Sequence, residues 1–246
     1  MDSSGKIFSD NKLKEIDVVI LTGGQGTRLR EVIKDRPKTM AKINQRPFLD
    51  ILIDYASSYG FRRFILCTGH MADVIKNYYT DKKNASSEVL FSNEDKPLGT
   101  GGAVKNAEDF IQSNPCLVMN GDSFCSVDLS EFIDFHLKKR AVLSMVVVEV
   151  SDTKDYGLIF IDDSQRIIQF EEKKGKEKAY INAGIYLFEK EIFSLIPPET
   201  KYSLEYDLFP KLVGKEFYGY ITQKRLIDIG TPERYEEGKR LFKEAI

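Results

Sequence analysis

The sequence predicts an α/β fold in which helices flank a mostly parallel central sheet and a smaller antiparallel portion follows. In the first half of the 246 residues, short apolar runs alternate with helical patterns, an order typical of parallel sheets covered on both faces. In the second half, strand-like segments are joined by short polar turns. No repeat or low-complexity linker divides the chain, so we expect a single domain over residues 15–246 after a disordered lead-in over residues 1–14.

The first half opens with residues 18–21, an apolar run that predicts a buried strand and leads directly into a glycine-rich turn. Residues 48–55 have helical periodicity, and Gly60 is placed to end that helix. Further strands are predicted at residues 64–67, 89–91 and 116–119, and further helices at residues 73–79 and 101–110. Ligands of such folds bind at the carboxyl ends of the strands, where the glycine turn, residues 94–102 and residues 120–122 fall.

The second half has a different pattern. Strands are predicted at residues 141–150, 157–161, 167–170 and 181–188, and helices at residues 204–213 and 232–245. Residues 162–165 form a clear hairpin turn between two of these strands. We expect an antiparallel or mixed sheet that lies as a lid over the first half.

The composition excludes several classes of protein. A net charge of −2 gives no basic surface for nucleic acid, and no apolar run approaches the roughly 20 residues of a membrane span. The first residues lack the apolar stretch of a signal peptide. The three cysteines have no C-x-x-C spacing and the two histidines fit no zinc pattern, which favours reduced, packed thiols in a cytoplasmic protein.

The glycine turn carries the clearest functional signal. It lacks the G-x-G-x-x-G spacing of dinucleotide-binding proteins and the Gly-Lys-Ser/Thr of a Walker A loop. A tight turn with solvated basic neighbours is the plain alternative. Glycine backbone can approach a ligand closely and donate N–H groups, while Arg28 and Lys38 add positive charge, so the segment suits a nucleoside triphosphate. The candidate nucleotide-binding residues are Leu21, Gly23, Gly24, Gln25, Gly26 and Thr27.

Two carboxylates are candidate metal ligands. Asp122 follows an apolar strand directly, where a magnesium ion could bind one or two carboxylates together with phosphate oxygens. A simple Asx turn is the alternative for Asp122. Asp228 lies between apolar neighbours, so its charge needs a partner or a metal. A helix start follows it, with Thr231 as N-cap and Pro232 at the first helical position.

Taken together, these motifs resemble those of the sugar-1-phosphate nucleotidyltransferases. They are G-G-x-G-T-R-L followed by P-K, a G-D after a central strand, and a later D-x-G-T-P. The resemblance runs from about residue 18 to residue 240 and implies a Rossmann-like nucleotidyltransferase fold with a smaller antiparallel sugar-binding lid. It implies that Asp122 and Asp228 bind Mg²⁺, and that Arg28 and Lys38 are the catalytic residues that hold the triphosphate and activate the attack.

The resemblance also assigns residues to the second substrate and to the nucleotide. Gly99 and Thr100 look like the family's L-G-T stretch near the base and sugar, and sugar-phosphate binding falls to Gly157, Glu172, Lys173 and Asn182. Composition alone would make residues 171–174 a solvated hairpin surface. Glu31 and Ile33 depart from the family, which often carries Pro and Thr at those positions, as does Lys174, where Pro is common.

The implied reaction is attack of a sugar 1-phosphate on an NTP with release of pyrophosphate. Among members of the family, the pattern looks most like the D-glycero-D-manno-heptose 1-phosphate guanylyltransferases, then mannose-1-phosphate guanylyltransferases, then uridylyl- and thymidylyltransferases. An inactive regulatory paralogue is the alternative from another class, although all four charged site residues are present. A homo-oligomer is possible, and the sequence leaves the oligomeric state open.

Glu94 favours GTP as the nucleotide. It lies five residues before Gly99, at a position that resembles the family's base-reading site. Guanine presents two adjacent donors on its Watson–Crick edge, and a carboxylate, which only accepts hydrogen bonds, can take both. The alternative is a solvated loop charge beside Asp95 and Lys96.

Overall fold

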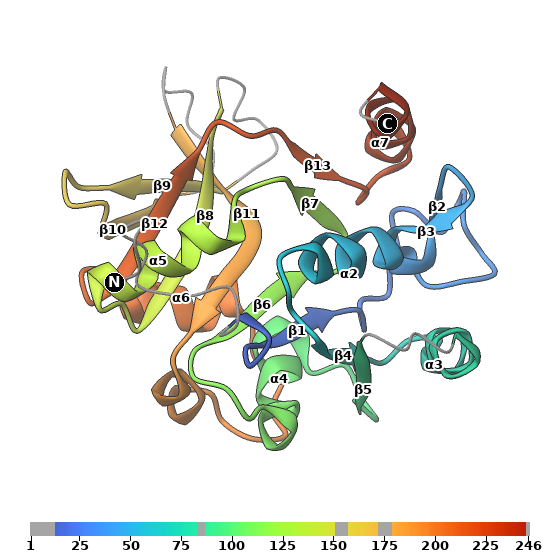
Figure 1. Cartoon of the computed structure of the whole chain (residues 1–246), viewed down its shortest axis with the longest axis horizontal. Coiled ribbons are helices and arrows are strands. Elements are labelled where there is room, and N and C mark those ends of the chain that lie inside the picture. Colours follow the sequence, from blue (N-terminus) through green and yellow to red (C-terminus); the bar gives the residue numbers. More distant parts are fainter. Residues whose placement is uncertain (1–12, 83–86, 151–156, 172–178, 245–246) are drawn as a thin grey trace.

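The computed structural model describes residues 13–82, 87–150, 157–171 and 179–244 (Figure 1). Its centre is a nine-stranded sheet with the order β10-β9-β11-β6-β1-β4-β5, to which β8 and β12 are added beside β11. The strands of this sheet are β1 Asp17–Leu21, β4 Arg63–Thr68, β5 Glu88–Asn93, β6 Cys116–Asn120, β8 Leu143–Val150, β9 Leu158–Ile161, β10 Ile167–Glu171, β11 Ala179–Phe188 and β12 Phe217–Thr222.

The first half forms the parallel part of this sheet, as predicted. β1 lies between β4 and β6 and pairs in parallel with both, with Val19 opposite Ile65 on one side and Val118 on the other. Alternate β1 residues face opposite sides, so Val18 and Ile20 belong to one apolar core while Val19 belongs to the other. Val18, Val19 and Ile20 of this central strand are completely buried, which explains why they are all apolar.

Helices cover both faces of the sheet. One core packs against α2 and α5, and the other against α4 and α6. The helices and short helical turns are η1 Lys38–Met40, α2 Phe48–Ser58, α3 Ala72–Asp81, α4 Gly99–Asn106, η2 Glu108–Phe110, α5 Leu129–Lys139, η3 Lys190–Leu195, η4 Leu204–Leu208, α6 Phe209–Leu212 and α7 Pro232–Glu244. None of the helices within the described ranges is long and apolar enough to cross a membrane.

The strands of the second half continue the same sheet. β11 pairs antiparallel with β6 and with β8, so the portion expected as a lid shares backbone hydrogen bonds with the parallel portion. β12 then returns parallel to β8. The hairpin turn at residues 162–165 is confirmed, because the Asp162 carboxylate accepts backbone hydrogen bonds from Ser164 and Arg166.

Some predicted boundaries shift. The helix expected over residues 101–110 divides into α4 and η2, and the helix expected over residues 204–213 divides into the π-helical η4 and the short α6. β5 is longer than the predicted strand at residues 89–91. Gly60 ends α2 with a φ of 107°, as expected. Leu13, which we placed in the lead-in, is buried in the core, while residues 1–12 lie outside the described ranges.

Two short two-stranded ladders complete the fold near the glycine turn. One joins β2 Lys42–Ile43 to β3 Arg46–Pro47, and the other joins β7 Ser123–Cys125 to β13 Leu226–Asp228. The second ladder connects the end of β6 with the start of α7 (Figure 1). The cysteines are free and buried, in agreement with the prediction of packed, reduced thiols.

Candidate active site

A cavity of about 480 Å³ lies at the carboxyl ends of β1 and β6, and we call it the reaction cavity. It gathers these residues that the sequence indicated: Leu21, Gly23, Gly24, Gln25, Lys38, Glu94, Gly99, Thr100 and Asp122. It also includes Asn120 and Gly121 of the segment that ends in Asp122, and Thr39, Ala103 and Lys201, which we had not singled out. The strand ends therefore meet where an α/β fold binds its ligand.

The glycine turn is tied to the neighbouring strand. Thr22 donates from its backbone N–H and from its hydroxyl to the carbonyl of Cys67, at 3.0 and 2.7 Å. Gly26 has a φ of +59°, and a Cβ there would lie 3.1 Å from the Cβ of Lys38. A Cβ at Gly24 would meet nothing within 4 Å. The start of the turn is thus held by Thr22, Gly26 packs closely on Lys38, and the space above Gly24 is open.

Lys38 and Asp122 form an ion pair inside the reaction cavity. Lys38 begins η1 immediately after Pro37, and Asp122 follows β6. The backbone N–H of Gly121 donates to the Leu21 carbonyl at 3.0 Å, and a Cβ at Gly121 would lie only 2.5 Å from that oxygen. Glycine at this position therefore allows the chain to pass close to β1 and brings the carboxylate to the lysine.

Asp228 lies beside Asp122 because β13 and β7 are paired. Asp228 stands opposite Ser123 in the ladder, and the backbone N–H of Ile229 donates to the Asp122 carbonyl at 3.0 Å. The Asp228 carboxylate also accepts a hydrogen bond from Arg234 at 2.8 Å. Arg234 is on the first turn of α7, which starts at Pro232 as predicted.

Glu94 occupies the space that two glycines leave free. A Cβ on Gly69 would lie 2.5 Å from Glu94 Oε1, and a Cβ on Gly23 would lie 3.0 Å from the same oxygen. The other carboxylate oxygen accepts the Leu98 backbone N–H at 3.0 Å. Burial raises the pKa of Glu94 above its ordinary value. Glu94 is therefore a half-buried acceptor in the cavity wall and not a freely solvated loop charge.

The glycines at the start of α4 have a role that the sequence did not reveal. A Cβ at Gly99 would lie 2.8 Å from the Tyr202 carbonyl, and one at Gly102 would lie 2.5 Å from the Thr200 carbonyl. The backbone N–H groups of Gly101 and Gly102 both donate to the Tyr202 carbonyl, at 2.9 and 3.0 Å. We call residues 200–204 the strap; it packs directly on α4 and brings Lys201 to the cavity.

The hydroxyl of Thr100 is engaged with residues of the strap and of η4. It donates to Glu205 at 2.7 Å and accepts from the Leu204 backbone N–H at 2.8 Å. Lys201 could not be found from a motif of its own.

Several predicted site residues lie elsewhere. Thr27 and Arg28 are exposed and are not among the residues that line the reaction cavity. Gly157 is exposed before β9. The Asn182 side chain binds the Tyr186 hydroxyl at 2.7 Å and the Gly184 backbone N–H at 2.8 Å, within a bulge of β11. Glu172 and Lys173 lie outside the described residues.

Two buried polar atoms in the cavity wall have no hydrogen-bond partner among the described residues: the Thr39 hydroxyl and the Asn120 Oδ1. Buried polar atoms are normally paired. Both belong to segments that carry a predicted site residue, since Thr39 follows Lys38 and Asn120 precedes Gly121 and Asp122. The Thr39 hydroxyl can donate and accept a hydrogen bond, and the Asn120 Oδ1 can accept one, in the same cavity as the ion pair.

Residues 17–244 match the Nucleotidyl transferase family. The chain belongs to this family. It is 37% identical over 221 residues to a D-glycero-α-D-manno-heptose 1-phosphate guanylyltransferase of Campylobacter jejuni, covering 89% of this chain and 97% of that one. The corresponding protein of Aneurinibacillus thermoaerophilus is 34% identical, with 92% and 97% covered.

A solved structure supports the same family assignment for this nucleotidyltransferase. HddC from Yersinia pseudotuberculosis, described as complexed with GMP-PN, superposes with a TM-score of 0.82 at 38% identity, covering 92% of this chain and 99% of that chain. The predicted fold and family are therefore confirmed over nearly the whole described chain.

Proposed function

We propose that this nucleotidyltransferase transfers a guanylyl group from GTP to D-glycero-α-D-manno-heptose 1-phosphate and releases pyrophosphate. The observation that carries the proposal is Glu94, a half-buried carboxylate in the wall of the reaction cavity, in a chain that matches guanylyltransferases along almost their full length. A carboxylate accepts the two adjacent donors of guanine, whereas uracil and thymine present a single N–H between carbonyls.

The reaction needs positioning and charge neutralisation more than proton transfer. An oxygen of the sugar phosphate attacks the α-phosphorus of GTP, a new P–O bond forms, and the bond to the β-phosphate breaks with its electrons leaving on pyrophosphate. The attacking group is already an anion, so no base has to remove a proton. Lys38 supplies positive charge inside the cavity, and the glycine turn offers backbone N–H groups, which stabilise charge without reorganisation.

Arg28 is assigned to the triphosphate by its place in the motif. It lies exposed on the glycine turn, so this role requires the side chain to swing toward the phosphates. Lys173 and Glu172 are assigned to the sugar phosphate by the family pattern alone, with Gly157 and Asn182 beside the sugar.

Asp122 and Asp228 suit a divalent cation, which we expect to be Mg²⁺. No group of three or more His, Cys, Asp or Glu side chains arranged for a metal occurs in the parts of the chain that are described. Magnesium is commonly bound by one or two carboxylates together with substrate phosphates. Asp228 on β13 and Asp122 directly before β7 provide two such carboxylates. An ion bound there would neutralise phosphate charge. Without the ion, Lys38 pairs with Asp122 and Arg234 pairs with Asp228.

A panel assay tests the proposal. Pyrophosphate release is measured with each of GTP, ATP, CTP, UTP and dTTP, combined in turn with heptose, mannose and glucose 1-phosphates in the presence of Mg²⁺. We expect the highest kcat/KM for GTP with D-glycero-α-D-manno-heptose 1-phosphate. A higher value for mannose 1-phosphate would reassign the sugar, and no release with any pair would indicate the inactive regulatory alternative.

The remaining partners follow from the same proposal. We expect substrates that are small molecules, no nucleic-acid partner and a cytoplasmic location, because the net charge is −2 and the buried cysteines are unpaired.

A further inference from the structure

The Asn120 side chain ends in an oxygen that the protein itself leaves unused. Oδ1 of Asn120 is buried in the wall of the reaction cavity, and it has no hydrogen-bond partner within the part of the chain that the structure describes. An amide oxygen only accepts hydrogen bonds, and a buried acceptor without a partner costs free energy. The cavity is therefore suited to a ligand that carries a donor at this point.

Two residues of β11 hold the Asn120 amide in this orientation. The buried Tyr186 hydroxyl accepts hydrogen bonds from the side chain of Asn182, at 2.7 Å, and from the side chain of Asn120. Gly184 has a φ of +74°, and a Cβ there would lie 2.8 Å from Nδ2 of Asn120. Because the amide nitrogen is engaged against β11, the oxygen is the part of the amide that remains for a ligand.

The partner that Oδ1 lacks has to be a donor or a cation, which excludes the phosphates. The Thr39 hydroxyl, the other unpaired atom of the wall, can donate to a phosphate oxygen, whereas the Asn120 Oδ1 cannot bind one. The proposed substrates donate from guanine, to which Glu94 is assigned, and from the hydroxyls of the ribose and of the sugar. A divalent cation is the remaining kind of partner for an amide oxygen.

Asn120 lies on the opposite face of the sheet from the ladder that carries Asp228. Alternate residues of a strand face opposite sides, so Asn120 shares the face of Val118, which belongs to the core against α4 and α6. Ile229, next to Asp228, belongs to the core against α2 and α5. This separation favours a substrate hydroxyl over the cation as the partner of Oδ1.

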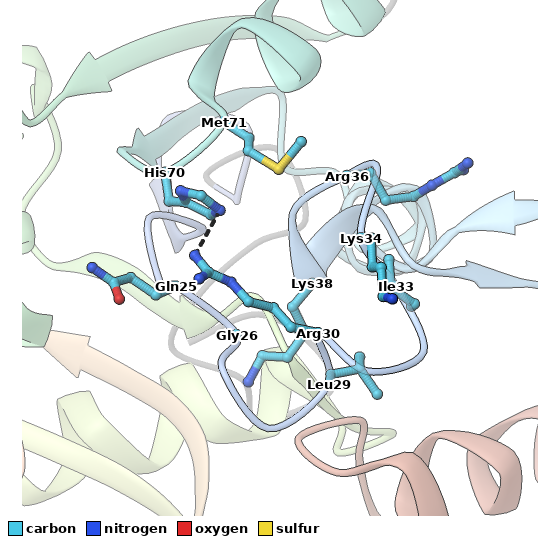
Figure 2. Close-up of a pocket in the computed structure, with 10 residues that line it drawn as sticks. All are labelled: Gln25, Gly26, Leu29, Arg30, Ile33, Lys34, Arg36, Lys38, His70 and Met71. Atoms are coloured by element: carbon cyan, nitrogen blue, oxygen red, sulfur yellow. Dashed lines mark hydrogen bonds between the residues drawn. The ribbon is translucent and has the colours of Figure 1, made fainter.

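The order of the strands places Asn120 on the sugar side of the site. The strands run β11-β6-β1-β4-β5, and Glu94, which we assign to the base, follows β5. The basic side chains of Arg30 and Lys38 follow β1 (Figure 2). The nucleotide therefore extends from β5 toward β6, and the attacking sugar lies beyond β6, toward β11. The Asn120 amide packs against β11.

We propose that the Asn120 Oδ1 accepts a hydrogen bond from a hydroxyl of the sugar 1-phosphate, and that Asn120 thereby determines which sugars are accepted. Tyr186 and Asn182 are positioning residues, because they act on the sugar only through the Asn120 amide. The inference rests on the proposed function, but not on the identity of the sugar or of the base. A site that binds a hydroxyl in this way discriminates strongly against an analogue without it, since the buried acceptor is then left unpaired.

Calorimetric titration with monodeoxy sugar phosphates tests the proposal. The protein is saturated with Mg²⁺ and with a GTP analogue that has a methylene bridge between its α- and β-phosphates, so that no transfer occurs. It is then titrated with D-glycero-α-D-manno-heptose 1-phosphate and with the monodeoxy forms of that sugar. We expect one deoxy form to bind the wild type at least about tenfold more weakly than the parent sugar. Asn120→Leu removes the acceptor and should bind the parent and that deoxy form equally.

Two further variants separate sugar recognition from a loss of structure. Asn114→Leu is the control, because Asn114 precedes the other end of β6 and its side chain accepts the Lys190 backbone N–H at 2.7 Å; it should discriminate like the wild type. Tyr186→Phe keeps Asn120 but removes its anchor, so it should reduce the discrimination at least threefold. Unchanged discrimination in Tyr186→Phe would overturn the positioning role.

The proposal would be overturned by a wild type that binds every deoxy form as tightly as the parent, or by discrimination that persists in Asn120→Leu. The wild-type comparison needs no variant, so it decides the question even if Asn120→Leu folds poorly. Weaker binding of the GTP analogue in Asn120→Leu, abolished by its 2′- or 3′-deoxy form, would assign Oδ1 to the ribose instead. A higher requirement for Mg²⁺ would assign it to the cation, and both results would contradict the proposal.

Failure of this proposal is distinguishable from failure of the proposed substrates. If the panel assay selects another sugar or another nucleotide, the titrations are made with that pair and carry the same expectation. They measure binding and need no turnover, so a protein that releases no pyrophosphate is tested in the same way with the GTP analogue and the heptose phosphates. Failure to bind any sugar 1-phosphate would overturn both proposals together.

Discussion

At the scale of single residues, the position of the Glu94 carboxylate depends on two neighbouring glycines that have no side chain. Gly23 and Gly69 leave the volume that its carboxylate fills, and the Leu98 backbone N–H fixes one oxygen. The conformational freedom of these glycines is less important here than their missing Cβ atoms. This wall of the reaction cavity is therefore shaped around one partly desolvated acid.

Replacement of Glu94 by Gln tests base reading. The amide keeps an acceptor for Leu98 but presents donors where guanine also presents donors. Hydrogen bonds to charged groups contribute about 1.5–3 kcal/mol, so the ratio of kcat/KM for GTP to that for UTP should fall at least about tenfold. Asp95→Asn, at an exposed position on the same segment, should leave the ratio unchanged. A GTP preference that survives in Glu94→Gln would refute base reading by this residue.

The same substitution should stabilise the protein at neutral pH. Burial raises the pKa of Glu94 above 4.5, its ordinary value. A group whose pKa is raised by folding favours the folded state below its unfolded pKa, and this contribution is lost as pH rises through the folded pKa. Glu94→Gln should therefore raise Tm at pH 8, with a gain that shrinks toward pH 4.5. A gain that is constant across this range would contradict the assignment.

At the scale of elements, the strap and α4 define one wall of the reaction cavity. Gly102 is the tightest point, since a Cβ there would lie 2.5 Å from the Thr200 carbonyl and 2.9 Å from the Leu98 Cβ. Because backbone cannot shift as easily as the end of a side chain, Gly102→Ala should push the strap away from α4. The position of Lys201 in the cavity depends on this contact.

Gly102→Ala should therefore lower both stability and turnover. Overpacking of this kind costs about 1–3 kcal/mol, which urea unfolding can measure. Gly24→Ala is the matched control, because its Cβ would meet nothing within 4 Å; it should change the free energy of unfolding by less than about 0.5 kcal/mol. Equal stability of the two variants would mean that the strap is not held by this contact.

The ladder of β7 and β13 predicts that Asp122 and Asp228 act together. Asp122→Asn and Asp228→Asn should each reduce kcat by about two orders of magnitude, in line with the loss of other charge-stabilising groups, and should shift the magnesium dependence to higher concentrations. Asp54→Asn removes an exposed carboxylate that is paired with Arg46 instead and should leave both unchanged. Near wild-type kcat in either site variant at saturating Mg²⁺ would remove that residue from the metal site.

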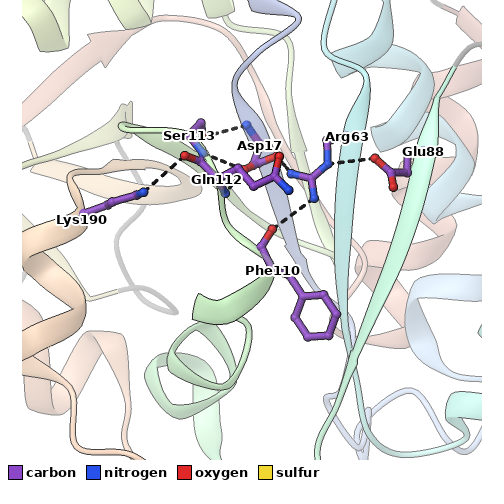
Figure 3. A network of polar contacts seen from close by, with 7 residues as sticks. All are labelled: Asp17, Arg63, Glu88, Phe110, Gln112, Ser113 and Lys190. Carbon is purple, nitrogen blue, oxygen red and sulfur yellow. Dashed lines mark hydrogen bonds and ion pairs between the residues drawn. The ribbon is translucent and has the colours of Figure 1, made fainter.

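At the scale of the whole molecule, the reaction cavity and a buried polar network lie at opposite ends of β1. Its carboxyl end leads into the glycine turn, while Asp17 at its amino end is 1% exposed and belongs to a polar network (Figure 3). Asp17 pairs with Arg63 and accepts the Ser113 backbone N–H at 2.9 Å. Arg63 also binds Glu88 on β5 at 2.9 Å. The network joins three strands and the turn before β6.

Asp17→Ala should destabilise the protein without altering its chemistry. Breaking a buried ion pair by removing one partner costs about 3–5 kcal/mol, so urea should unfold the variant at clearly lower concentration. The folded fraction should keep wild-type kcat/KM, because the network lies at the opposite end of the strand from the cavity. Reduced kcat/KM at full folding would show that the two ends are coupled.

Sequence patterns predicted the parts of the site that are local in the chain. The glycine turn, Gly121-Asp122 and the start of α7 each follow a strand or precede a helix, so their signals lie within a few residues. The strap could not be predicted this way, because Thr100 and Glu205 are 105 residues apart and their contact depends on tertiary packing. The contact between Arg30 and His70 (Figure 2) was missed for the same reason, since the two residues come from different segments.

One competition experiment tests the proposed reaction most directly. The purified protein is given equimolar GTP, ATP, CTP, UTP and dTTP with D-glycero-α-D-manno-heptose 1-phosphate and Mg²⁺, and the nucleotide-sugar formed is identified by mass spectrometry. We predict that GDP-heptose is the dominant product and that its share falls in Glu94→Gln. A product that is mainly UDP- or dTDP-heptose, or no nucleotide-sugar at all, would contradict the proposed function.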